Sequence, residues 1–459
     1  MKSRDITIVI IVLIVIALVS GCFPEDSLEW SDDGSIGLLH EGGALYLIDG
    51  QSGDPTRIVE DNVQLWPTVS NDGKLIAYAA EVSCDSLPAD LELLPSSQTL
   101  MIKECAELMK NNILRGDESR PGFPTIGHKA FESEYRNWII RYMCENADDE
   151  LTKKLGINKT QKGRTLPLEC YRLLVKSTDS QNAQTVVATS VLPMMRPRFS
   201  PDKRRLAYLM QGMESGPEDP FDLYIASLED NSRVMFVASS VAIGYDWRED
   251  SQAICYLRHD ESIAGNMGLG VLGVADTTEP NALRAVPFGF SGSPIAFTFF
   301  SPWMRAEYGL GGRIFFSNAA LSIPARKSDE LKWSLFCYDP VTQSISDVLP
   351  RNLSDHVKEA IILFSLSPDK TEILIGLDDF VIYRLEDGQV LRPFKGISTG
   401  KSSSEDWVPA WKGNDQVSCM APADSHYLNG TKEHGSEQIV IINTNAELIK
   451  VLSENWQLN

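Results

Sequence analysis

The sequence predicts an all-β protein, a β-propeller of seven four-stranded blades with a helical insertion in the second blade. Two observations predict this fold. A unit of strand, tight polar turn and strand recurs at a spacing of about 40–50 residues, which is the period of propeller blades. One stretch of about 85 residues interrupts the repeats and shows helical spacing of its apolar residues instead.

The clearest unit covers residues 199–228. Its turn, Ser200-Pro201-Asp202, leads into an apolar strand at 206–210, and a second strand follows at 223–228. Proline presets the first turn angle, and an aspartate can accept a hydrogen bond from the backbone two residues further on. The stretch therefore predicts strand, tight turn, strand, loop and strand.

Related turns indicate where the other blades begin. Each unit is expected to open with an apolar strand that ends in Ser-x-Asp or a near relative. The seven turns start at Ser31, Ser70, Ser200, Arg248, Ser301, Ser367 and Lys412. The fourth and fifth turns depart furthest from the pattern, and in the fifth unit an irregular turn is expected before a strand at 313–316. Six or eight blades would follow if either unit is misread.

These residues resemble the TolB-like (WD40-like) propeller repeat, in which a Ser-Pro-Asp-Gly turn continues into an Ile-Ala-Tyr-like strand. The resemblance covers most of residues 28–459 outside the insertion and is strongest at 199–228 and 366–385. The chain lacks the N-terminal α/β domain of TolB itself and differs in its N-terminus and blade number. The resemblance implies a propeller in the cell envelope, with no catalytic residues to transfer.

The insertion, residues 83–168, predicts a small helical subdomain. Apolar side chains at 101, 105, 108, 109 and 113 follow helical spacing, as do those at 131, 135, 138, 139, 142 and 143. A third helix is expected after Asn146, because acidic residues 148–150 favour the positive end of a helix, and it should stop at Gly156. The aromatic residues are expected to form a local core.

The cysteines of this region allow two disulfides. Cys84 and Cys170 lie where the insertion leaves and rejoins adjacent predicted strands, so a bond between them would close its base. Cys105 and Cys144 lie on different predicted helices and could join them. The alternative is that all of these are buried thiols, because connectivity cannot be read from a sequence. Cys255, Cys337 and Cys419 fall within predicted strands and are expected in the core.

The N-terminus predicts a lipoprotein signal peptide at residues 1–21. Lys2 and Arg4 precede an apolar run at 6–19, which is too short for a typical membrane-spanning helix. The run ends in Ser20-Gly21-Cys22, which resembles the prokaryotic lipobox. Cys22 is then the lipidated first residue, residues 22–27 form a tether and residues 28–459 form the propeller. An ordinary signal peptide or an uncleaved anchor is the alternative.

The net charge of the chain indicates which classes of partner it can bind. The chain carries 42 basic and 63 acidic residues, a net charge of −21. Without residues 1–21 it has 40 basic and 62 acidic residues, a net charge of −22. Such a charge argues against binding nucleic acid or an anionic membrane surface. We expect a domain attached to a prokaryotic membrane by its N-terminal lipid, on the periplasmic or cell-surface side.

Long loops gather on one expected face of the propeller, which therefore predicts a ligand face. All six histidines fall on that side, and a metal site would need several of them to converge near the central channel. No pair has the spacing of metal ligands, so no cofactor is expected. The candidate ligand-face residues are His40, His259, His426 and His434, with His128 and His356 on the same side.

Three functions remain open from the sequence. The first is a non-catalytic module that binds an envelope protein or a glycan through the face that carries the insertion. The second is a metal-assisted polysaccharide lyase or hydrolase built on the same propeller, with channel-facing histidines. The third is a spacer between envelope components. No convergent catalytic set is present, and this favours the first.

Overall fold

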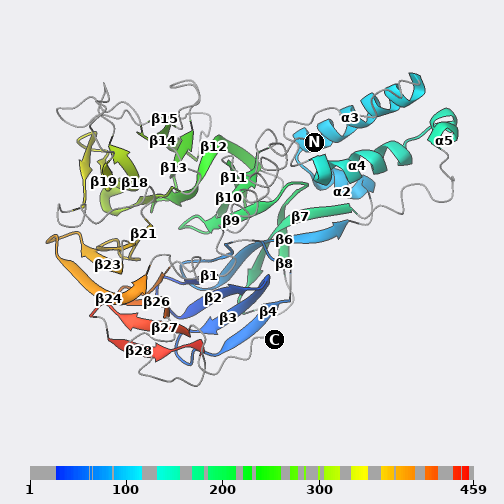
Figure 1. The fold of residues 1–459 in the computed structure, drawn as a ribbon. Helices are drawn as coiled ribbons and strands as arrows, with labels where there is room; N and C mark the ends of the chain where they lie inside the picture. The colour runs from blue at the N-terminus through cyan, green and yellow to red at the C-terminus, as the bar shows by residue number, and fades with distance from the viewer. Residues whose placement is uncertain are drawn as a thin grey trace, which may run out of the picture. The chain divides into compact units, whose positions relative to one another are not determined.

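The structure, a computed structural model, has five four-stranded sheets and one eight-stranded sheet in the residues that it describes (Figure 1). The structure describes residues 27–60, 62–64, 66–84, 87–115, 132–155, 168–179, 184–212, 221–229, 234–259, 269–277, 284–285, 298–299, 304–320, 332–349, 363–376, 379–398, 409–421, 438–445 and 447–453. The expected signal peptide, Cys22 and the tether up to residue 26 lie outside these ranges.

Each four-stranded sheet is an antiparallel meander in chain order, the arrangement of a propeller blade. The first sheet is β1 (Ser27–Trp30), β2 (Ile36–Glu41), β3 (Ala44–Asp49) and β4 (Pro55–Val59). The second is β5 (Thr68–Val69), β6 (Leu75–Cys84), β7 (Leu168–Ser177) and β8 (Gln184–Ser190). The fifth repeat forms β17 (Ala306–Tyr308), β18 (Ile314–Ala320), β19 (Lys332–Asp339) and β20 (Ser344–Asp347). The next sheet is β21 (Phe364–Leu366), β22 (Glu372–Gly376), β23 (Asp379–Arg384) and β24 (Val390–Ser398). The last is β25 (Ala410–Lys412), β26 (Gln416–Ala421), β27 (Gln438–Asn443) and β28 (Leu448–Val451).

The third and fourth repeats share one eight-stranded sheet. It contains β9 (Met194–Phe199), β10 (Arg205–Gln211), β11 (Phe221–Ser227), β12 (Val234–Trp247), β13 (Ala253–His259), β14 (Leu269–Asp276), β15 (Arg284–Ala285) and β16 (Thr298–Phe299). The long strand β12 pairs with β11 up to Val241 and with β13 from Val241 onward. The structure is thus mostly β, with six separate sheets. The finer expectation of seven blades is not confirmed by this sheet count.

The repeated turns have one shared geometry. In four of them the serine hydroxyl donates to the aspartate carboxylate two residues later, at 2.7, 2.9, 2.6 and 2.7 Å. The same serine oxygen accepts the backbone N–H five residues later, where the next strand begins. The residue after the aspartate has a positive φ, so glycine is favoured there. These four turns begin at Ser31, Ser70, Ser200 and Ser367.

The fifth repeat begins later than the sequence predicted. Phe299 belongs to β16 and pairs with Leu269 of the preceding sheet, so it does not open a new blade. The first strand is instead β17, and the turn after it is a 3-10 segment, η3 (Leu310–Gly312). Gly311 and Gly312 have φ values of 68° and 75°, a backbone that these glycines allow without steric cost. Ser301 and Pro302, where the sequence placed the turn, lie outside the described residues.

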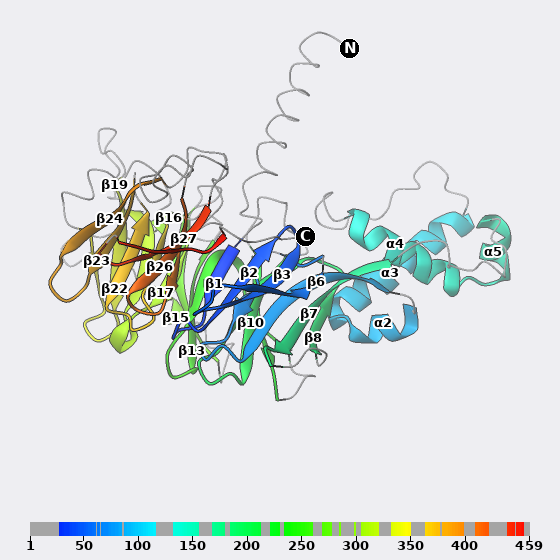
Figure 2. The same cartoon turned by 90° about the horizontal axis from the view of Figure 1, so that it is seen from below.

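Helices occupy the insertion, between β6 and β7 of the second sheet. They are α2 (Leu87–Leu93), α3 (Ser96–Arg115), α4 (Glu132–Glu145) and α5 (Asp149–Leu155). The three helices expected from the apolar spacing are confirmed as α3, α4 and α5, while α2 was not expected. Figure 2 shows the four helices grouped beyond the ends of β6 and β7. No helix in the described part of the chain is long and apolar enough to span a membrane.

The chain divides into two compact units. The first comprises residues 1–61 and 363–459, and in it the first and last sheets share one apolar core that includes Trp30, Tyr46, Ile439 and Ile441. The second comprises residues 62–362, where helices and strands share a core that includes Ile102, Trp138, Leu173 and other buried side chains. The insertion is therefore packed onto its sheet through an apolar core.

Candidate functional site

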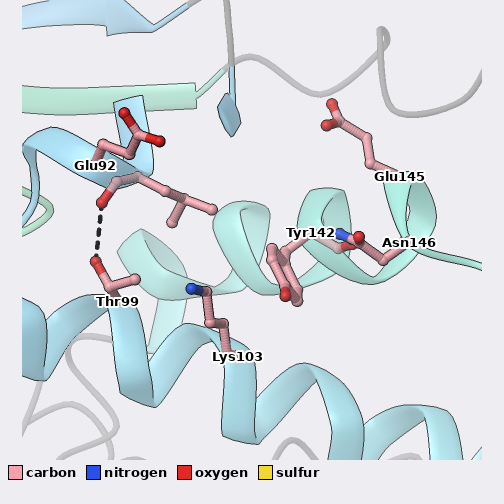
Figure 3. A pocket seen from close by; sticks show the side chains of 7 residues that line it. Glu92, Thr99, Lys103, Tyr142, Glu145 and Asn146 are labelled. Atoms are coloured by element: carbon pink, nitrogen blue, oxygen red, sulfur yellow. Dashed lines mark hydrogen bonds between the residues drawn. The ribbon is translucent and has the colours of Figure 1, made fainter. Parts of the chain in front are cut away.

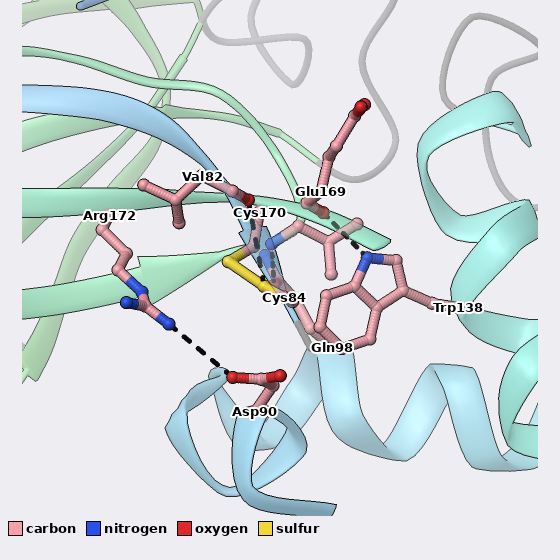
Figure 4. The surroundings of a disulfide bond; sticks show 9 residues. Val82, Cys84, Asp90, Gln98, Trp138, Glu169, Cys170 and Arg172 are labelled. Atoms are coloured by element: carbon pink, nitrogen blue, oxygen red, sulfur yellow. Dashed lines mark hydrogen bonds and ion pairs between the residues drawn. A yellow bond between two sulfur atoms is a disulfide. The ribbon is translucent and has the colours of Figure 1, made fainter. Parts of the chain in front are cut away.

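The helices are fastened to the second sheet at several points (Figure 4). A disulfide joins Cys84, the last residue of β6, to Cys170 near the start of β7. Trp138 of α4 is buried and donates its indole N–H to Glu169 O at 3.0 Å. Arg172 of β7 forms an ion pair with Asp90 of α2 at 3.6 Å. The insertion thus has a fixed position on its own sheet.

A buried glutamine adds polar links between α3 and the sheet. Gln98 has no exposed surface, so its amide must find partners within the protein. Its Nε2 donates to Ser190 Oγ at 2.8 Å, and its Oε1 accepts the Val191 N–H at 2.9 Å. Both partners lie at or just after the end of β8. A buried amide satisfied in this way fixes the rotation of α3, because another orientation would leave polar atoms unpaired.

Local chemistry fixes the ends of the helices. Asp148 precedes α5 and accepts the Leu151 N–H at 2.9 Å, which is an N-cap. This backbone hydrogen bond, with Lys110 at 3.4 Å, holds the Asp148 pKa below its usual value. Lys154 donates to the carbonyl oxygens of Ile113 and Leu114, the unpaired acceptors at the end of α3. The acidic residues expected at this helix start do lie in its first turn.

An open cavity of about 450 Å³ lies among the helices of the insertion (Figure 3). Figure 3 shows Lys103 of α3 and Tyr142 of α4 extending into the space between the two helices. Its lining residues come from α2, α3, α4 and the residue after α4: Leu91, Glu92, Thr99, Lys103, Tyr142, Glu145 and Asn146. Cavities of this size hold small molecules or the anchoring side chains of a partner.

Several polar side chains that line the cavity already have hydrogen-bond or ion-pair partners within the protein. Thr99 Oγ1 donates to Leu91 O at 3.0 Å, and Asn146 Nδ2 donates to Tyr142 O at 2.9 Å. Glu145 accepts from Arg141 Nε at 3.1 Å. Lys103 and Glu92 are exposed. The cavity therefore offers an ammonium, a carboxylate and an aromatic ring on fixed helices, a set suited to binding.

Exposed leucines flank this cavity. Leu93 and Leu100 are 53% and 56% exposed and follow the lining residues Glu92 and Thr99 in the sequence. Leu108, two turns further along α3, is 53% exposed. Leu93 and Leu100 are thus exposed apolar side chains next in the sequence to two residues that line the cavity.

The second expected disulfide is absent. Cys105 on α3 and Cys144 on α4 are both thiols, and burial raises the pKa of Cys105. The inward positions of α4 are those of Trp138, Ile139 and Met143. Cys144 is one residue past Met143, which turns it about 100° around the helix from the packed stripe. The expected core cysteines Cys255, Cys337 and Cys419 are buried strand residues.

The expected ligand-face histidines do not form a site in the described residues. His40 lies within β2 and is buried, with 2% of its surface exposed. His259 is the last residue of β13 and is half-buried. His426 and His434 lie outside the described residues, as do His128 and His356. Within the ranges that the structure describes, no three His, Cys, Asp or Glu side chains group to hold a metal ion.

Sequence reasoning located the helices but missed the cavity. The signal that could have found it is a set of polar residues four apart on the predicted helices, Thr99 with Lys103 and Tyr142 with Asn146. Residues four apart share a helix face. Such pairs are common on any exposed helix, however, and only the packing of α2, α3 and α4 makes them line one space.

Comparison with known proteins gives a likeness of fold. No family model and no curated protein matches the sequence. Among solved structures, TolB from Acinetobacter baumannii has 12% identity, with 92% of this chain and 77% of that chain covered and a TM-score of 0.36. The propeller domain of the Trilobed protease from Pyrococcus furiosus has 11% identity, 94% and 99% coverage and a TM-score of 0.48. Oligogalacturonate lyase from Vibrio parahaemolyticus has 12% identity, 79% and 74% coverage and a TM-score of 0.41.

Proposed function

We propose that this chain is a non-catalytic binding module that recognises an envelope protein or a glycan through its helical insertion. The observation that carries the proposal is the open cavity between helices that are fixed to their sheet by a disulfide, a buried glutamine and a shared core. A surface whose backbone is held in place loses little conformational entropy when it binds, so more of its contact energy appears as affinity. The exposed leucines beside the cavity favour a protein partner.

The proposal includes a lipid anchor outside the cytoplasm. Its support is the lipobox-like end at Cys22 and the Cys84–Cys170 disulfide, since disulfides persist mainly in oxidising compartments. Mass spectrometry of the mature N-terminal peptide should find a lipid on Cys22 and no residue before it. An unmodified Cys22, or a chain that still carries residues 1–21, would contradict the anchor.

The proposal also includes seven blades. β12 changes partner at Val241, so its two halves act as the fourth strand of one blade and the first strand of the next. The eight-stranded sheet then holds two blades, and the register shift between Val241 and Tyr245 in the β12–β13 pair lies at their boundary. An experimental structure that separates β12 into two blades would support this count, and one with a single blade there would contradict it.

Cross-linking in cells tests the binding function. The full chain is compared with a variant in which residues 85–168 are replaced by an Asn-Gly turn, which can join β6 directly to β7. We expect a partner that only the full chain captures, while both proteins give a cooperative unfolding transition. Equal capture by both would contradict a site on the insertion.

Two point variants locate the site more sharply. Leu100→Glu places a charge beside the cavity and should weaken capture, because an apolar contact would have to accept an unpaired carboxylate. Ile449→Glu is the matched control, since Ile449 is 51% exposed on β28 in the other unit. Equal loss in both variants would show a general effect of surface charge. The lyase or hydrolase alternative stays a prediction, which measurement of bound divalent metal in the purified chain would test.

A further inference from the structure

Three arginines lie on neighbouring strands of the second unit, apart from the insertion. Arg196 and Arg198 belong to β9, and Arg305 directly precedes β17. The second half of β12 contacts both strands. Arg198 Nη1 donates to Asp246 Oδ1 at 2.9 Å and to Tyr245 O at 3.3 Å, and Gly244 N donates to Met304 O at 3.0 Å. Three strands from successive repeats therefore bring these guanidinium groups together.

Gly244 allows β17 to approach closely. A Cβ atom at this position would lie 2.3 Å from Arg305 Cα, which no side chain could tolerate. Glycine thus lets the backbone of Arg305 pack directly on β12. The position of Arg305 in the cluster depends on this contact.

Arg196 lies in a β-bulge. Between the paired residues Arg198–Ala207 and Met195–Leu209, β9 has two residues where β10 has one. Arg196 has a φ of 49°, an uncommon backbone for a residue with a Cβ, and the Tyr245 hydroxyl donates to its carbonyl oxygen. Bulges re-aim a side chain, and strained residues of this kind concentrate at binding sites.

The Arg196 side chain is buried but incompletely satisfied. It is 7% exposed, and its Cζ lies 5.9 Å from the centre of the Trp66 ring. Its Nε has no hydrogen-bond partner in the structure. An arginine with a purely structural role is expected to use its buried N–H groups, because an unpaired buried donor costs stability. The unpaired Nε is therefore a donor that an anionic acceptor would satisfy.

The charges around Arg196 are mainly positive. Two carboxylates, Asp246 and Glu307, face three guanidinium groups, and Asp246 already accepts from Arg198 and from the Tyr308 N–H. Burial, with Arg305 and Arg198 nearby, lowers the pKa of Arg196 to about 9. Burial also lowers the pKa of Arg305. This electropositive cluster lies in a chain whose net charge is −21.

We propose that Arg196, Arg198 and Arg305 form a binding site for the anionic oxygen group of a small ligand, a carboxylate or a phosphate. Planar guanidinium groups donate paired hydrogen bonds to either anion. The Trp66 ring lies against the Arg196 guanidinium and helps to hold it in place. An anion there satisfies the unpaired Nε and balances the like charges.

Thermal unfolding of the full chain tests the site with two probes, sodium succinate and sodium phosphate, at ionic strength held constant with sodium chloride. A ligand that binds only the folded state raises the melting temperature. Arg305→Gln should lower the affinity for the effective probe about tenfold or more, the effect of losing a charge-assisted hydrogen bond. Arg204→Gln is the control, because it removes the same charge from an exposed pair with Glu229.

The outcomes separate the ligand sources. A rise with succinate alone assigns a carboxylate, and a rise with phosphate alone assigns a phosphate. No rise with either, or an equal rise in the wild type and Arg305→Gln, overturns the site. Arg305→Gln removes both the repulsion from Arg196 and the attraction of the buried Glu307, so its rise with ligand is measured from its own melting temperature without ligand. The result is also independent of the function proposed for the insertion, because none of these arginines belongs to it.

Discussion

Trp30 donates its indole N–H to Ser418 Oγ at 3.0 Å, across 388 positions of the sequence. The two residues lie in β1 and β26, so this bond joins the first sheet of the chain to the last. Lys412 lies over the same indole ring at 5.2 Å. Each of the two sheets is complete with four strands from its own end of the chain, so side chains, rather than a shared strand, make this junction.

Loss of this hydrogen bond should destabilise the junction. Trp30→Phe keeps the aromatic ring but leaves the Ser418 hydroxyl without its donor, so we expect a loss of about 1–2 kcal/mol in the free energy of unfolding. Ser418→Ala should cost a similar amount, and the double variant should cost less than the sum of the two. Urea unfolding of the four proteins measures the coupling. Strict additivity would show that the bond does not contribute.

The repeat turns predict a stabilising substitution. Lys370 has a φ of 61° at the turn position where the first two turns have Gly34 and Gly73. Lys370→Gly should remove the steric cost of this backbone, and after the greater entropy of the unfolded chain is subtracted we expect a gain of about 0.5–1 kcal/mol. Gly34→Ala is the opposite test, because its φ is 68° and the added Cβ would lie 2.9 Å from Lys412 Cγ. Thermal unfolding should move the two variants in opposite directions.

The fold was predictable where the determinants are local. Ser200, Pro201 and Asp202 form their turn largely with one another, so a short string of residues identified it. The apolar stripe of α4 was readable for the same reason. In the fifth repeat the irregular turn and the strand expected at 313–316 are present, as Gly311-Gly312 and β18, but the first strand was misplaced because the pairing of Phe299 with Leu269 has no local signal.

The sites were not predictable, because they depend on contacts between distant segments. Arg196 and Arg305 are 109 positions apart, and only the packing of β9, β12 and β17 brings them together. The cavity likewise needs α2, α3 and α4 in place. A sequence shows which side chains are present. The arginine cluster and the cavity, however, form only when strands or helices from distant segments pack together, and no local pattern encodes that packing.

Acid should weaken one contact between repeats. Lys203 Nζ lies 2.6 Å from Asp72 Oδ2, which joins the second and third repeat turns, and it lowers the Asp72 pKa from 3.8 to about 2. A carboxyl whose pKa is lowered on folding contributes stability above its unfolded pKa and loses it as pH falls through the folded value. The loss should therefore occur between about pH 4 and pH 2, and solvent screening limits it to about 1 kcal/mol or less.

Urea unfolding at several pH values tests this contact. Lys203→Gln should lower stability at pH 6 and have a smaller effect at pH 2, where about half of the Asp72 carboxyl groups are protonated in the folded wild type. Arg204→Gln, which breaks the neighbouring exposed pair with Glu229, is the control. An equal effect of Lys203→Gln at both pH values would mean that the lysine acts by some means other than the Asp72 charge.

The disulfide should be the strongest single constraint on the insertion. Cys84 and Cys170 are 86 positions apart. Closing a loop of that length reduces the entropy of the unfolded chain, which stabilises the folded state by about 4–5 kcal/mol. The double variant Cys84→Ala/Cys170→Ala should therefore unfold at a clearly lower temperature than the oxidised wild type. Cys105→Ala is the control, and it should still respond to a reductant as the wild type does. No effect of a reductant on the wild type would contradict the bond.

Alkaline pH should destabilise the protein through buried tyrosines. Burial raises the pKa of Tyr208, Tyr224, Tyr256 and Tyr308 above the usual value of 10. Above pH 10 these hydroxyls ionise in the unfolded chain but stay protonated in the folded one. The folded state then binds more protons, so stability is complete below about pH 10 and falls as pH rises further.

The buried arginines change stability with pH in the opposite direction to the tyrosines. The net change in the free energy of unfolding at alkaline pH depends on which group of residues contributes more. The pKa of Arg196 is lowered to about 9, so above that pH the unfolded chain keeps a proton that the folded one loses, and Arg305 has a pKa lowered in the same sense. Four tyrosines outnumber two arginines, so we expect a net loss between pH 10 and pH 11.5. Tyr208→Phe removes one of the buried hydroxyls. It should reduce by up to one the number of protons that unfolding releases, so that stability falls less steeply with pH. Urea midpoints at pH 8, 10 and 11 measure this slope, and a stability that rises above pH 10 would mean that the arginines dominate.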